Sequence, residues 1–269
     1  MNATNRRSLL DLARRAVADG VSVIESRSVG SISSKGDRDF VTDIDVAVQQ
    51  RIQDFLHSET PNIGFLGEEG DDVRRERGSL WVLDPIDGTS NFIHGLPLFG
   101  VSLALLEGNE PTIGVIAFPS LGLEYYAALG MGAFRNGESI RVGTASLLSE
   151  SIVSLGDYAV GGDSAERNRP RLSLTALLAA QVERIRMFGS AAFDLACVAD
   201  GRTDGCVILS NNPWDIAAGT VIVRESGGLL YDSDGSTHSV ASRHTIAGNG
   251  FTANELVGLA SRAHSDSLW

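Results

Sequence analysis

The sequence predicts an α+β protein built from layers of helices and strands, and two observations indicate this fold class. Up to about Thr144, short β-favouring runs follow one another as in a largely antiparallel sheet, whereas beyond it strand and helix alternate. The composition, with 43% hydrophobic and 21% charged residues, is typical of a packed globular protein. We therefore expect an N-terminal α+β domain over residues 1–144 and a C-terminal α/β domain over residues 145–269.

The first half is expected to open with two helices. Apolar residues recur at helical spacing over residues 7–26, with charged residues on the other face. Residues 33–39 have the polar, Gly-containing composition of a loop. Thr42 then has the character of an N-cap, so a second helix is predicted to begin directly after it.

The middle of the chain reads as adjacent strands. Apolar, β-favouring runs are separated by Gly, Pro, Asn or acidic turns, at residues 63–66, 80–83, 99–106, 112–118 and 123–129. Asn136-Gly137 is a strong hairpin signal, because a type I′ turn needs positive φ at both central positions. It predicts a hairpin that pairs residues 132–134 with residues 140–142.

The second half predicts strands at residues 152–155, 185–188 and 206–209, with helices at 170–180, at 191–199 and from about Trp214. Residues 161–169 are the most loop-like stretch of this half. Thr252 is followed three positions later by Glu255, and this spacing predicts a capping box that opens a final helix.

Charge and cysteine content exclude several classes of protein. A formal net charge of −12, from 34 acidic and 22 basic residues, argues against a nucleic-acid partner. No apolar run approaches the roughly 20 residues of a membrane span, and residues 1–11 contain no continuous apolar core of a signal peptide. Cys197 and Cys206 are too few for a disulfide framework. We expect a cytoplasmic protein with no membrane partner.

The strongest chemical signal is the segment Asp84-Pro85-Ile86-Asp87-Gly88-Thr89, which follows an apolar strand. Two carboxylates stand three positions apart, and Pro85 and Gly88 are expected to fix a sharp turn between them. Mg²⁺ prefers oxygen ligands held in rigid geometry, so this turn suits it. Amides of Gly88 and Thr89 at a helix start are suited to a phosphate. The segment therefore predicts a metal and an anion side by side.

Other acidic residues stand at the boundaries of predicted elements. Asp43 and Asp45 open the second helix, Glu68 and Glu69 follow a strand, and Asp215 follows Pro213-Trp214. Taken singly, such an Asp is usually a helix cap or a partner of the helix dipole. For Asp84 and Asp87, the neighbouring Pro85 and Gly88 favour a metal-binding role over a capping role.

Together these blocks resemble the inositol monophosphatase family, part of a group of Mg²⁺-dependent, Li⁺-sensitive phosphatases that includes fructose-1,6-bisphosphatases. The blocks occur in family order, and they are Gly67-Glu68-Glu69, residues 84–92, and residues 214–219 with Glu225-Ser226-Gly227-Gly228. Weaker support comes from residues 40–45 and from Gly189-Ser190-Ala191-Ala192. The resemblance implies a layered αβαβα sandwich and, by analogy, a homodimer.

The resemblance also implies roles for individual residues. It implies two or three Mg²⁺ ions, with Mn²⁺ as a substitute, held by Glu68, Asp84, the Ile86 carbonyl, Asp87 and Asp215. Asp45, Glu68 and Thr89 would act on the attacking water, and Gly88 with Thr89 would bind the phosphate. Contacts with the rest of the substrate would come from Asp87, Gly189 and Ala191, and Asn211 and Asn212 are expected to contact the polyol where this chain departs from the family pattern. Lys35 falls near a lysine that the family keeps in a loop at the metal site.

One departure from the pattern leaves the substrate open. Members that act on inositol phosphate carry a Glu seven residues before the Asp of the Trp-Asp motif, and here that position is Ile208. A phosphomonoester of inositol or a related cyclitol or sugar remains the leading hypothesis. Histidinol phosphate, 3′-phosphoadenosine 5′-phosphate and fructose 1,6-bisphosphate are alternatives, because their phosphatases share the metal frame. A catalytically silent scaffold of the same fold is the alternative outside the enzymes.

Overall fold

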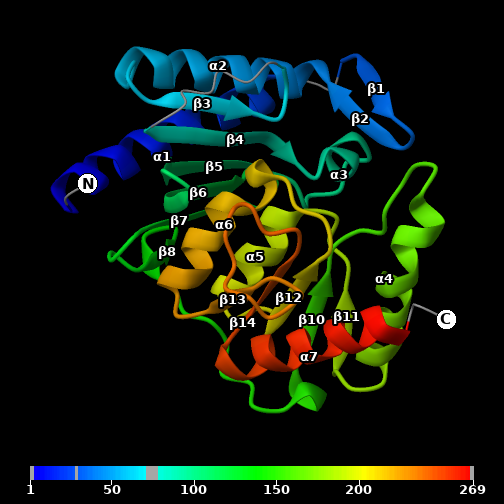
Figure 1. Cartoon of the computed structure of the whole chain (residues 1–269). Helices are drawn as coiled ribbons and strands as arrows, with labels where there is room; N and C mark the ends of the chain where they lie inside the picture. Colours follow the sequence, from blue (N-terminus) through cyan, green and yellow to red (C-terminus); the bar gives the residue numbers. More distant parts are fainter. Residues whose placement is uncertain (1–2, 28–29, 71–77, 267–269) are drawn as a thin grey trace.

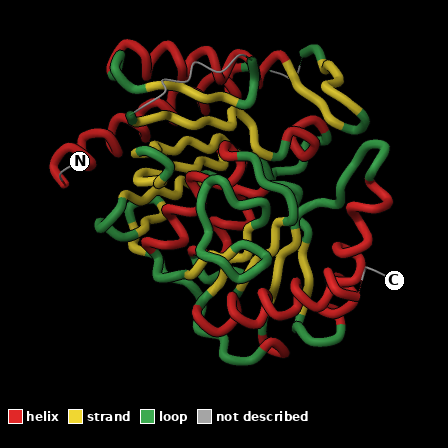
Figure 2. Tube along the Cα trace, viewed as in Figure 1, coloured by secondary structure: helices red, strands yellow, loops and turns green. Residues whose placement is uncertain are grey.

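The computed structural model of the chain describes residues 3–27, 30–70 and 78–266. Its helices and strands form five layers in the order α, β, α, β, α, as the sequence analysis predicted (Figure 1). A pair of helices covers one sheet, a second pair separates the two sheets, and a third pair covers the other sheet (Figure 2). The pairs are α1 (Ala3–Ser26) with α2 (Asp43–Glu59), α5 (Ala191–Ala199) with α6 (Pro213–Glu225), and α4 (Ser164–Ala179) with α7 (Gly250–Asp266).

The larger sheet has seven strands in the order β3-β4-β5-β6-β7-β8-β9. Only β3 and β4 pair in parallel, and every other pair is antiparallel, which confirms a largely antiparallel sheet. The strands are β3 (Gly64–Gly67), β4 (Ser79–Asp87), β5 (Gly100–Glu107), β6 (Glu110–Phe118), β7 (Leu123–Ala128), β8 (Ala133–Arg135) and β9 (Glu138–Ser139). The short α3 (Thr89–Ile93) follows β4, and a 3₁₀ turn, η1 (Pro119–Leu121), precedes β7.

The smaller sheet has five strands in the order β11-β10-β12-β14-β13. Strand β10 pairs in parallel with β11 and β12, because α4 and α5 provide the crossovers that parallel strands need. The remaining pairs are antiparallel. The strands are β10 (Ile152–Leu155), β11 (Arg184–Arg186), β12 (Gly205–Ile208), β13 (Leu229–Tyr231) and β14 (Thr245–Gly248), and η2 (Leu148–Glu150) leads into β10.

Two predictions about hairpins were wrong in part. The loop expected at residues 33–39 is instead an antiparallel hairpin of β1 (Ile32–Gly36) and β2 (Asp39–Thr42), which turns at Arg38 with a φ of 58°. A register shift between Ser34 and Gly36 hides the alternation that marks a strand. In the Asn136-Gly137 hairpin the turn is correct, but the returning strand is β9 rather than residues 140–142.

Two predictions about helix starts were also wrong. Helix α4 begins at Ser164, inside the expected loop, because its polar residues face solvent, and Asn168 exchanges hydrogen bonds of 2.7 and 2.9 Å with the Ala159 backbone. Helix α7 begins at Gly250 instead of after Thr252. Its cap is Asn249, whose side-chain oxygen accepts hydrogen bonds of 2.9 Å from the amides of Phe251 and Thr252.

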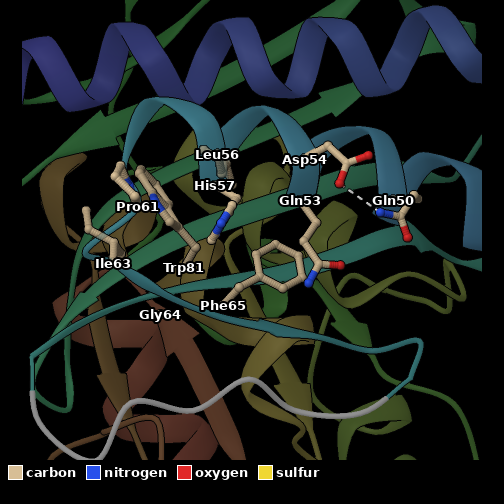
Figure 3. Close-up of a pocket in the computed structure, with 10 residues that line it drawn as sticks. All are labelled: Gln50, Gln53, Asp54, Leu56, His57, Pro61, Ile63, Gly64, Phe65 and Trp81. Carbon is tan, nitrogen blue, oxygen red and sulfur yellow. Dashed lines mark hydrogen bonds between the residues drawn. The ribbon is translucent and has the colours of Figure 1, made fainter.

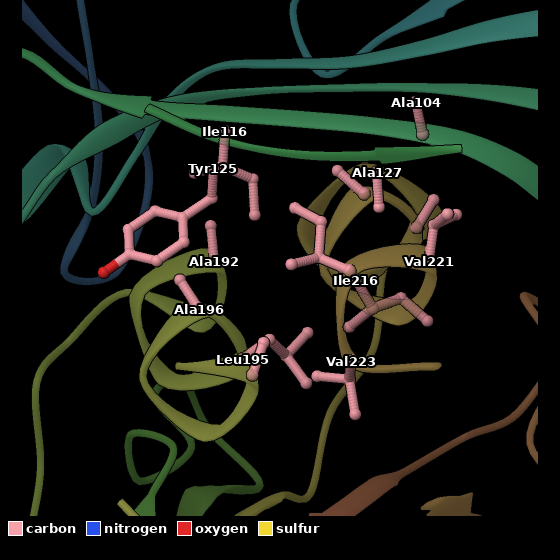
Figure 4. Close-up of a cluster of buried hydrophobic side chains, with 14 of the residues drawn as sticks. Ala104, Ile116, Tyr125, Ala127, Ala192, Leu195, Ala196, Ile216, Val221 and Val223 are labelled. Carbon is pink, nitrogen blue, oxygen red and sulfur yellow. The ribbon is translucent and has the colours of Figure 1, made fainter. Parts of the chain in front are cut away.

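Helices α5 and α6 pack tightly between the two sheets. Figure 4 shows their apolar faces, including Leu195 and Ile216, against Ile116 and Ala127 of the larger sheet. A Cβ atom added at Gly114 would lie 2.3 Å from the Ala218 carbonyl oxygen, so β6 and α6 touch backbone to backbone. The same cluster draws residues from both sides of position 144, and the division into two domains there stays a prediction.

In the described ranges, no helix combines the length and the apolar character that crossing a bilayer demands.

We predict that Gly114→Ala destabilises the protein by about 1–3 kcal/mol, because the added methyl group meets backbone that cannot rotate away. Urea unfolding followed by circular dichroism measures this change. Gly258→Ala in α7 is the matched control, since its added Cβ would meet no atom within 4 Å and should stabilise the helix by about 0.5–1 kcal/mol. Equal stability of the two variants would contradict the close packing of β6 and α6.

Candidate functional site

The end of β4 places two buried carboxylates in one irregular stretch of strand. Strand pairing continues through Asp87, with a register shift between Asp84 and Asp87, so the sharp turn expected between these residues is wrong. A bulge accommodates Pro85, which has no amide to donate. The Ile86 amide donates to Asp84 Oδ1 at 3.0 Å, and the turn falls at Gly88, where φ is +88°.

Glu68 is held beside Asp84 by the neighbouring strand. The Glu68 amide donates to the Leu83 carbonyl at 3.1 Å and so continues the parallel pairing of β3 with β4. The side chain of Gln49 accepts from the Glu69 amide at 2.9 Å and donates to the Glu69 carbonyl. Sequence reasoning missed Gln49, although a polar residue between Val48 and Ile52 on the apolar face of α2 was a signal.

Thr42 and Asp45 form a capping box at the start of α2. Asp45 Oδ2 accepts hydrogen bonds from the Thr42 amide and hydroxyl. Thr89 Oγ1 lies 3.4 Å from Asp45 Oδ1 and 3.0 Å from the Ile86 carbonyl oxygen. One carboxylate oxygen of Asp45 thus fixes the helix, and the other faces the Thr89 hydroxyl. The side chain of Lys35 lies outside the described residues.

Asp87 connects the larger sheet to α5. Its carboxylate accepts hydrogen bonds from the Ser190 hydroxyl and from the amides of Ala191 and Ala192, at 3.3 and 2.8 Å for the two amides. Asn91 donates to the carbonyls of Leu98 and Phe188, both at 2.7 Å, and holds the segment before α5 in place. Neither Ser190 nor Asn91 received a role from the sequence, because their partners lie about a hundred residues away.

Asp215 reaches the site from the first turn of α6. Its Oδ2 accepts from the amide and the side chain of Asn212, at 3.2 and 3.1 Å, in a second capping box. The side chain of Asn211 instead bonds Ser242 and Thr245, in the chain segment that leads into and forms β14. The proposed contacts of Asn211 and Asn212 with substrate therefore stay predictions, and neither residue lines the pocket described next.

These elements surround a pocket of about 210 Å³. Predicted site residues on its wall are Glu68, Asp84, Ile86, Asp87, Gly88, Thr89, Gly189, Ala191 and Asp215. Further lining residues are Gly156, Asp157, Ser190, Asp194, Ile208 and Ser210. Asp45 lies behind Thr89 and does not line the pocket. The pocket thus combines carboxylates from three layers of the fold.

A larger hollow of about 370 Å³ lies beneath α2, away from these carboxylates (Figure 3). Trp81, Phe65 and Ile63 form its apolar floor, and Asp54 is the one carboxylate among its described lining residues. Asp54 accepts a hydrogen bond of 2.8 Å from Gln50, as the dashed line in Figure 3 shows. This hollow has no converging set of reactive groups, so the smaller pocket is the candidate site.

Burial and mutual repulsion raise the pKa values of the pocket carboxylates. Burial is the largest cause for Asp84, Asp87 and Asp215, and it raises the pKa of Asp87 to about 6 and that of Asp215 to about 8. The pKa of Asp84 is raised further by the charges of Glu68, Asp87 and Asp215 and by a hydrogen bond with Glu68. The hydrogen bonds from Ser190 and Ala192 oppose the increase at Asp87.

The chemistry of this donor set fits a hard divalent cation. Two carboxylates in hydrogen-bond contact must share a proton or a cation, and the set contains only oxygen donors, which Mg²⁺ prefers. In the described residues, no three His, Cys, Asp or Glu side chains converge closely enough to hold a metal ion as they stand. The residue types and their shared pocket are what support the fit.

Comparison with known proteins points the same way. A model of the inositol monophosphatase family matches residues 5–266. The fructose-1,6-bisphosphatase/inositol-1-monophosphatase of Thermotoga maritima is 42% identical over 223 residues, which cover 82% of each chain. The Nus factor SuhB of Pseudomonas aeruginosa is 35% identical over 248 residues, which cover 90% of this chain and 91% of SuhB.

Solved structures extend the similarity to the fold. An inositol monophosphatase of Thermotoga maritima superposes with a TM-score of 0.88 at 35% identity and covers 97% of this chain and 99% of its own. The inositol monophosphatase of Anabaena gives a TM-score of 0.87 at 30% identity and covers 98% of this chain and 100% of its own. The predicted layered sandwich is thereby confirmed.

We predict that the metal-free protein becomes more stable as the pH falls from about 8 towards 4. A carboxyl group whose pKa is higher in the folded chain than its ordinary 3.8 binds more protons when folded, so its contribution is lost as pH rises through the folded value. Urea unfolding in chelator at several pH values measures this slope. Asp215→Asn should flatten it, while Asp11→Asn, on the exposed face of α1, should not. A slope unchanged by Asp215→Asn would contradict the prediction.

Proposed function

Because the chain belongs to the inositol monophosphatase family, whose members are phosphoric monoester hydrolases, we propose that it is a Mg²⁺-dependent enzyme that hydrolyses small polyol phosphates. An inositol monophosphate or a related cyclitol or sugar phosphate is the leading substrate. The observation that carries the proposal is the pocket in which Glu68, Asp84, Asp87 and Asp215 meet the start of α3.

Mg²⁺ ions would be held by these four carboxylates and by the Ile86 carbonyl oxygen. Bound Mg²⁺ supplies positive charge that neutralises the phosphate and lowers the pKa of a water molecule. Asp84 and Glu68 come from adjacent parallel strands, Asp87 is oriented by Ser190, and Asp215 is oriented by Asn212. Each ligand is therefore fixed by a neighbour before the metal binds, which lowers the cost of assembling the site.

The proton of the attacking water is assigned to Thr89 and Asp45. The Thr89 hydroxyl lies between the Ile86 carbonyl oxygen and Asp45 Oδ1, so it can accept from water while it donates to Asp45. Burial raises the pKa of Asp45, which makes this carboxylate a better proton acceptor. Glu68 faces the same pocket and is the second candidate to orient the water.

The phosphate is assigned to the first amides of α3. The amides at the start of a helix have no acceptor within the helix, and those of Gly88 and Thr89 adjoin Asp87. Gly88 is required there, because a Cβ atom would lie 2.9 Å from the Leu98 carbonyl oxygen and 3.2 Å from that of Gly189. Gly189 and Ala191 border the same pocket and are proposed to contact the substrate.

The names of some relatives indicate alternative substrates or functions. The Thermotoga relative is named for fructose-1,6-bisphosphatase as well as inositol-1-monophosphatase, and histidinol phosphate or 3′-phosphoadenosine 5′-phosphate would use the same metal frame. A silent scaffold is disfavoured, because buried carboxylates without a cation are costly. Homodimerisation, a cytoplasmic location and the absence of a nucleic-acid partner stay predictions, and relatives named Nus factor SuhB make the last worth testing.

We predict that phosphate release requires Mg²⁺, that Mn²⁺ replaces Mg²⁺ in part, and that release stops in chelator and slows in millimolar Li⁺. The oxygen-only donor set motivates the metal requirement, and the family motivates the Li⁺ effect. A panel of inositol 1-phosphate, glycerol 2-phosphate, histidinol phosphate, 3′-phosphoadenosine 5′-phosphate and fructose 1,6-bisphosphate, assayed for released phosphate, measures it. Full turnover after removal of divalent metal would refute the proposal.

We predict that Asp87→Asn lowers kcat by more than about 100-fold, beyond the 10- to 100-fold typical of residues that only orient a metal ligand. The side chain keeps an oxygen for α5, so the fold should persist. Mg²⁺ raises the melting temperature only of a protein that binds it when folded, so this shift should also disappear. Asp11→Asn is the control that keeps both. Equal Mg²⁺-dependent shifts in wild type and Asp87→Asn would exclude Asp87 as a ligand.

A further inference from the structure

The residues proposed to bind metal and phosphate line only one side of the pocket. These residues are Glu68, Asp84, Asp87, Gly88, Thr89 and Asp215. All of them except Asp215 come from the first half of the chain. The opposite wall comes from the second half and contains Gly156, Asp157, Asp194, Ile208 and Ser210. We expect the alcohol that leaves the phosphate to face this wall, next to Gly189 and Ala191, which are already proposed to contact the substrate.

Asp157 stands at the edge of this wall, beside Ile208. Strands β10 and β12 run in parallel, so they end at the same edge of the sheet, and Leu155 pairs with Val207. The Gly156 amide donates to the Val207 carbonyl at 2.9 Å, which extends this pairing by one residue. A Cβ atom at Gly156 would lie 3.4 Å from Ile208 Cα. Asp157 therefore follows directly after the point where β10 touches the apolar Ile208.

The carboxylate of Asp157 is free to bind a ligand. Among the described residues, no hydrogen bond or ion pair joins it to another side chain or to the backbone. Partial burial is the single cause that raises its pKa, and the residue keeps enough exposure to be reached from solvent. An exposed carboxylate without a protein partner on the wall of a pocket is available to accept hydrogen bonds from a substrate.

A second carboxyl group, Asp194, lies beneath the same wall. It is 1% exposed and lines the pocket, and the Ser154 hydroxyl lies close to its carboxylate. Burial raises its pKa well above the ordinary value, a hydrogen bond from Ser154 opposes this increase, and the charges of Asp87 and then Asp157 add to it.

We propose that Asp157 determines substrate specificity by accepting hydrogen bonds from hydroxyl groups of the leaving alcohol. This inference rests on the proposed phosphatase function and names the residue that recognises the hydroxyl groups of the polyol phosphate in the same pocket. Ile208 beside it contributes an apolar contact, so the acceptor is provided by the end of β10 and not by the end of β12.

The test compares esters with and without hydroxyl groups on the leaving group. Asp157→Ala should lower kcat/KM about 10- to 100-fold for inositol 1-phosphate and glycerol 2-phosphate, because a hydrogen bond to a charged acceptor is lost. The value for p-nitrophenyl phosphate, whose leaving group has no hydroxyl donor, should change less than about 3-fold. Asp157→Asn removes the charge but keeps an acceptor oxygen, so it should give a smaller loss that is confined to the same hydroxyl-bearing esters. Asp11→Ala is the remote control.

A rescue variant separates a contact from a structural effect. Ile208→Glu in the Asp157→Ala background moves a carboxylate to the adjacent strand end, and it should restore kcat/KM for the hydroxyl-bearing esters over p-nitrophenyl phosphate. Phosphoethanolamine, which carries an ammonium group instead of a hydroxyl, tests the other donor. A loss confined to phosphoethanolamine would overturn the proposal in favour of a cation site.

Other outcomes overturn the inference in distinguishable ways. Equal losses for all esters, or no loss for any, would show that Asp157 does not contact the leaving group. Cleavage of p-nitrophenyl phosphate without cleavage of either hydroxyl-bearing ester would refute the substrate class but keep the phosphatase. Absence of Mg²⁺-dependent phosphate release from every ester would remove the proposed function, and this inference with it.

Discussion

Mutual repulsion among four carboxylates is the constraint around which this protein is organised. Burial removes the water that would screen these charges, and the pKa values of Asp84, Asp87 and Asp215 rise in response. A fold tolerates such a cluster when protons or cations neutralise its charge. At neutral pH, bound divalent cations would neutralise it and could also act in catalysis. The stability of the chain and its proposed activity are thereby linked through one set of side chains.

The cluster keeps its shape because Asp84, Asp87 and Asp215 also accept hydrogen bonds from the backbone. Asp87 accepts the first amides of α5, and Asp215 closes the capping box of α6. Both helices lie in the middle layer. Gly114 contacts Ala218 there, and Gly219 packs against Leu195 so closely that a Cβ atom would not fit, which leaves little room for movement. The packing between the sheets therefore sets the positions of ligands that come from opposite halves of the chain.

Local patterns predicted those parts of the molecule whose cause is local. The cap at Thr42, the helix from 191 to 199 and the strand from 152 to 155 follow from residues within a few positions. The β1–β2 hairpin was missed because its bulge breaks the alternation, and the start of α4 was missed because an exposed helix needs few apolar residues. Motif spacing singled out four carboxylates that line the pocket, namely Glu68, Asp84, Asp87 and Asp215. It could not reveal Gln49, Ser190 or Asp157, whose significance depends on partners or surfaces that only the folded chain brings together.

The division of labour across the pocket explains how chemistry and specificity can vary separately. The residues proposed to bind metal and phosphate form hydrogen bonds with the larger sheet, α5 and α6. A substitution at one of these residues therefore disturbs several elements at once. The opposite wall is built from the ends of β10 and β12, and the side chains of Asp157 and Ile208 make no hydrogen bond to the carboxylate cluster in the described structure. Parallel strands that end at one edge offer equivalent positions for a single acceptor. A carboxylate can consequently be lost from one strand end and regained at its neighbour without any change in the machinery that cleaves the ester.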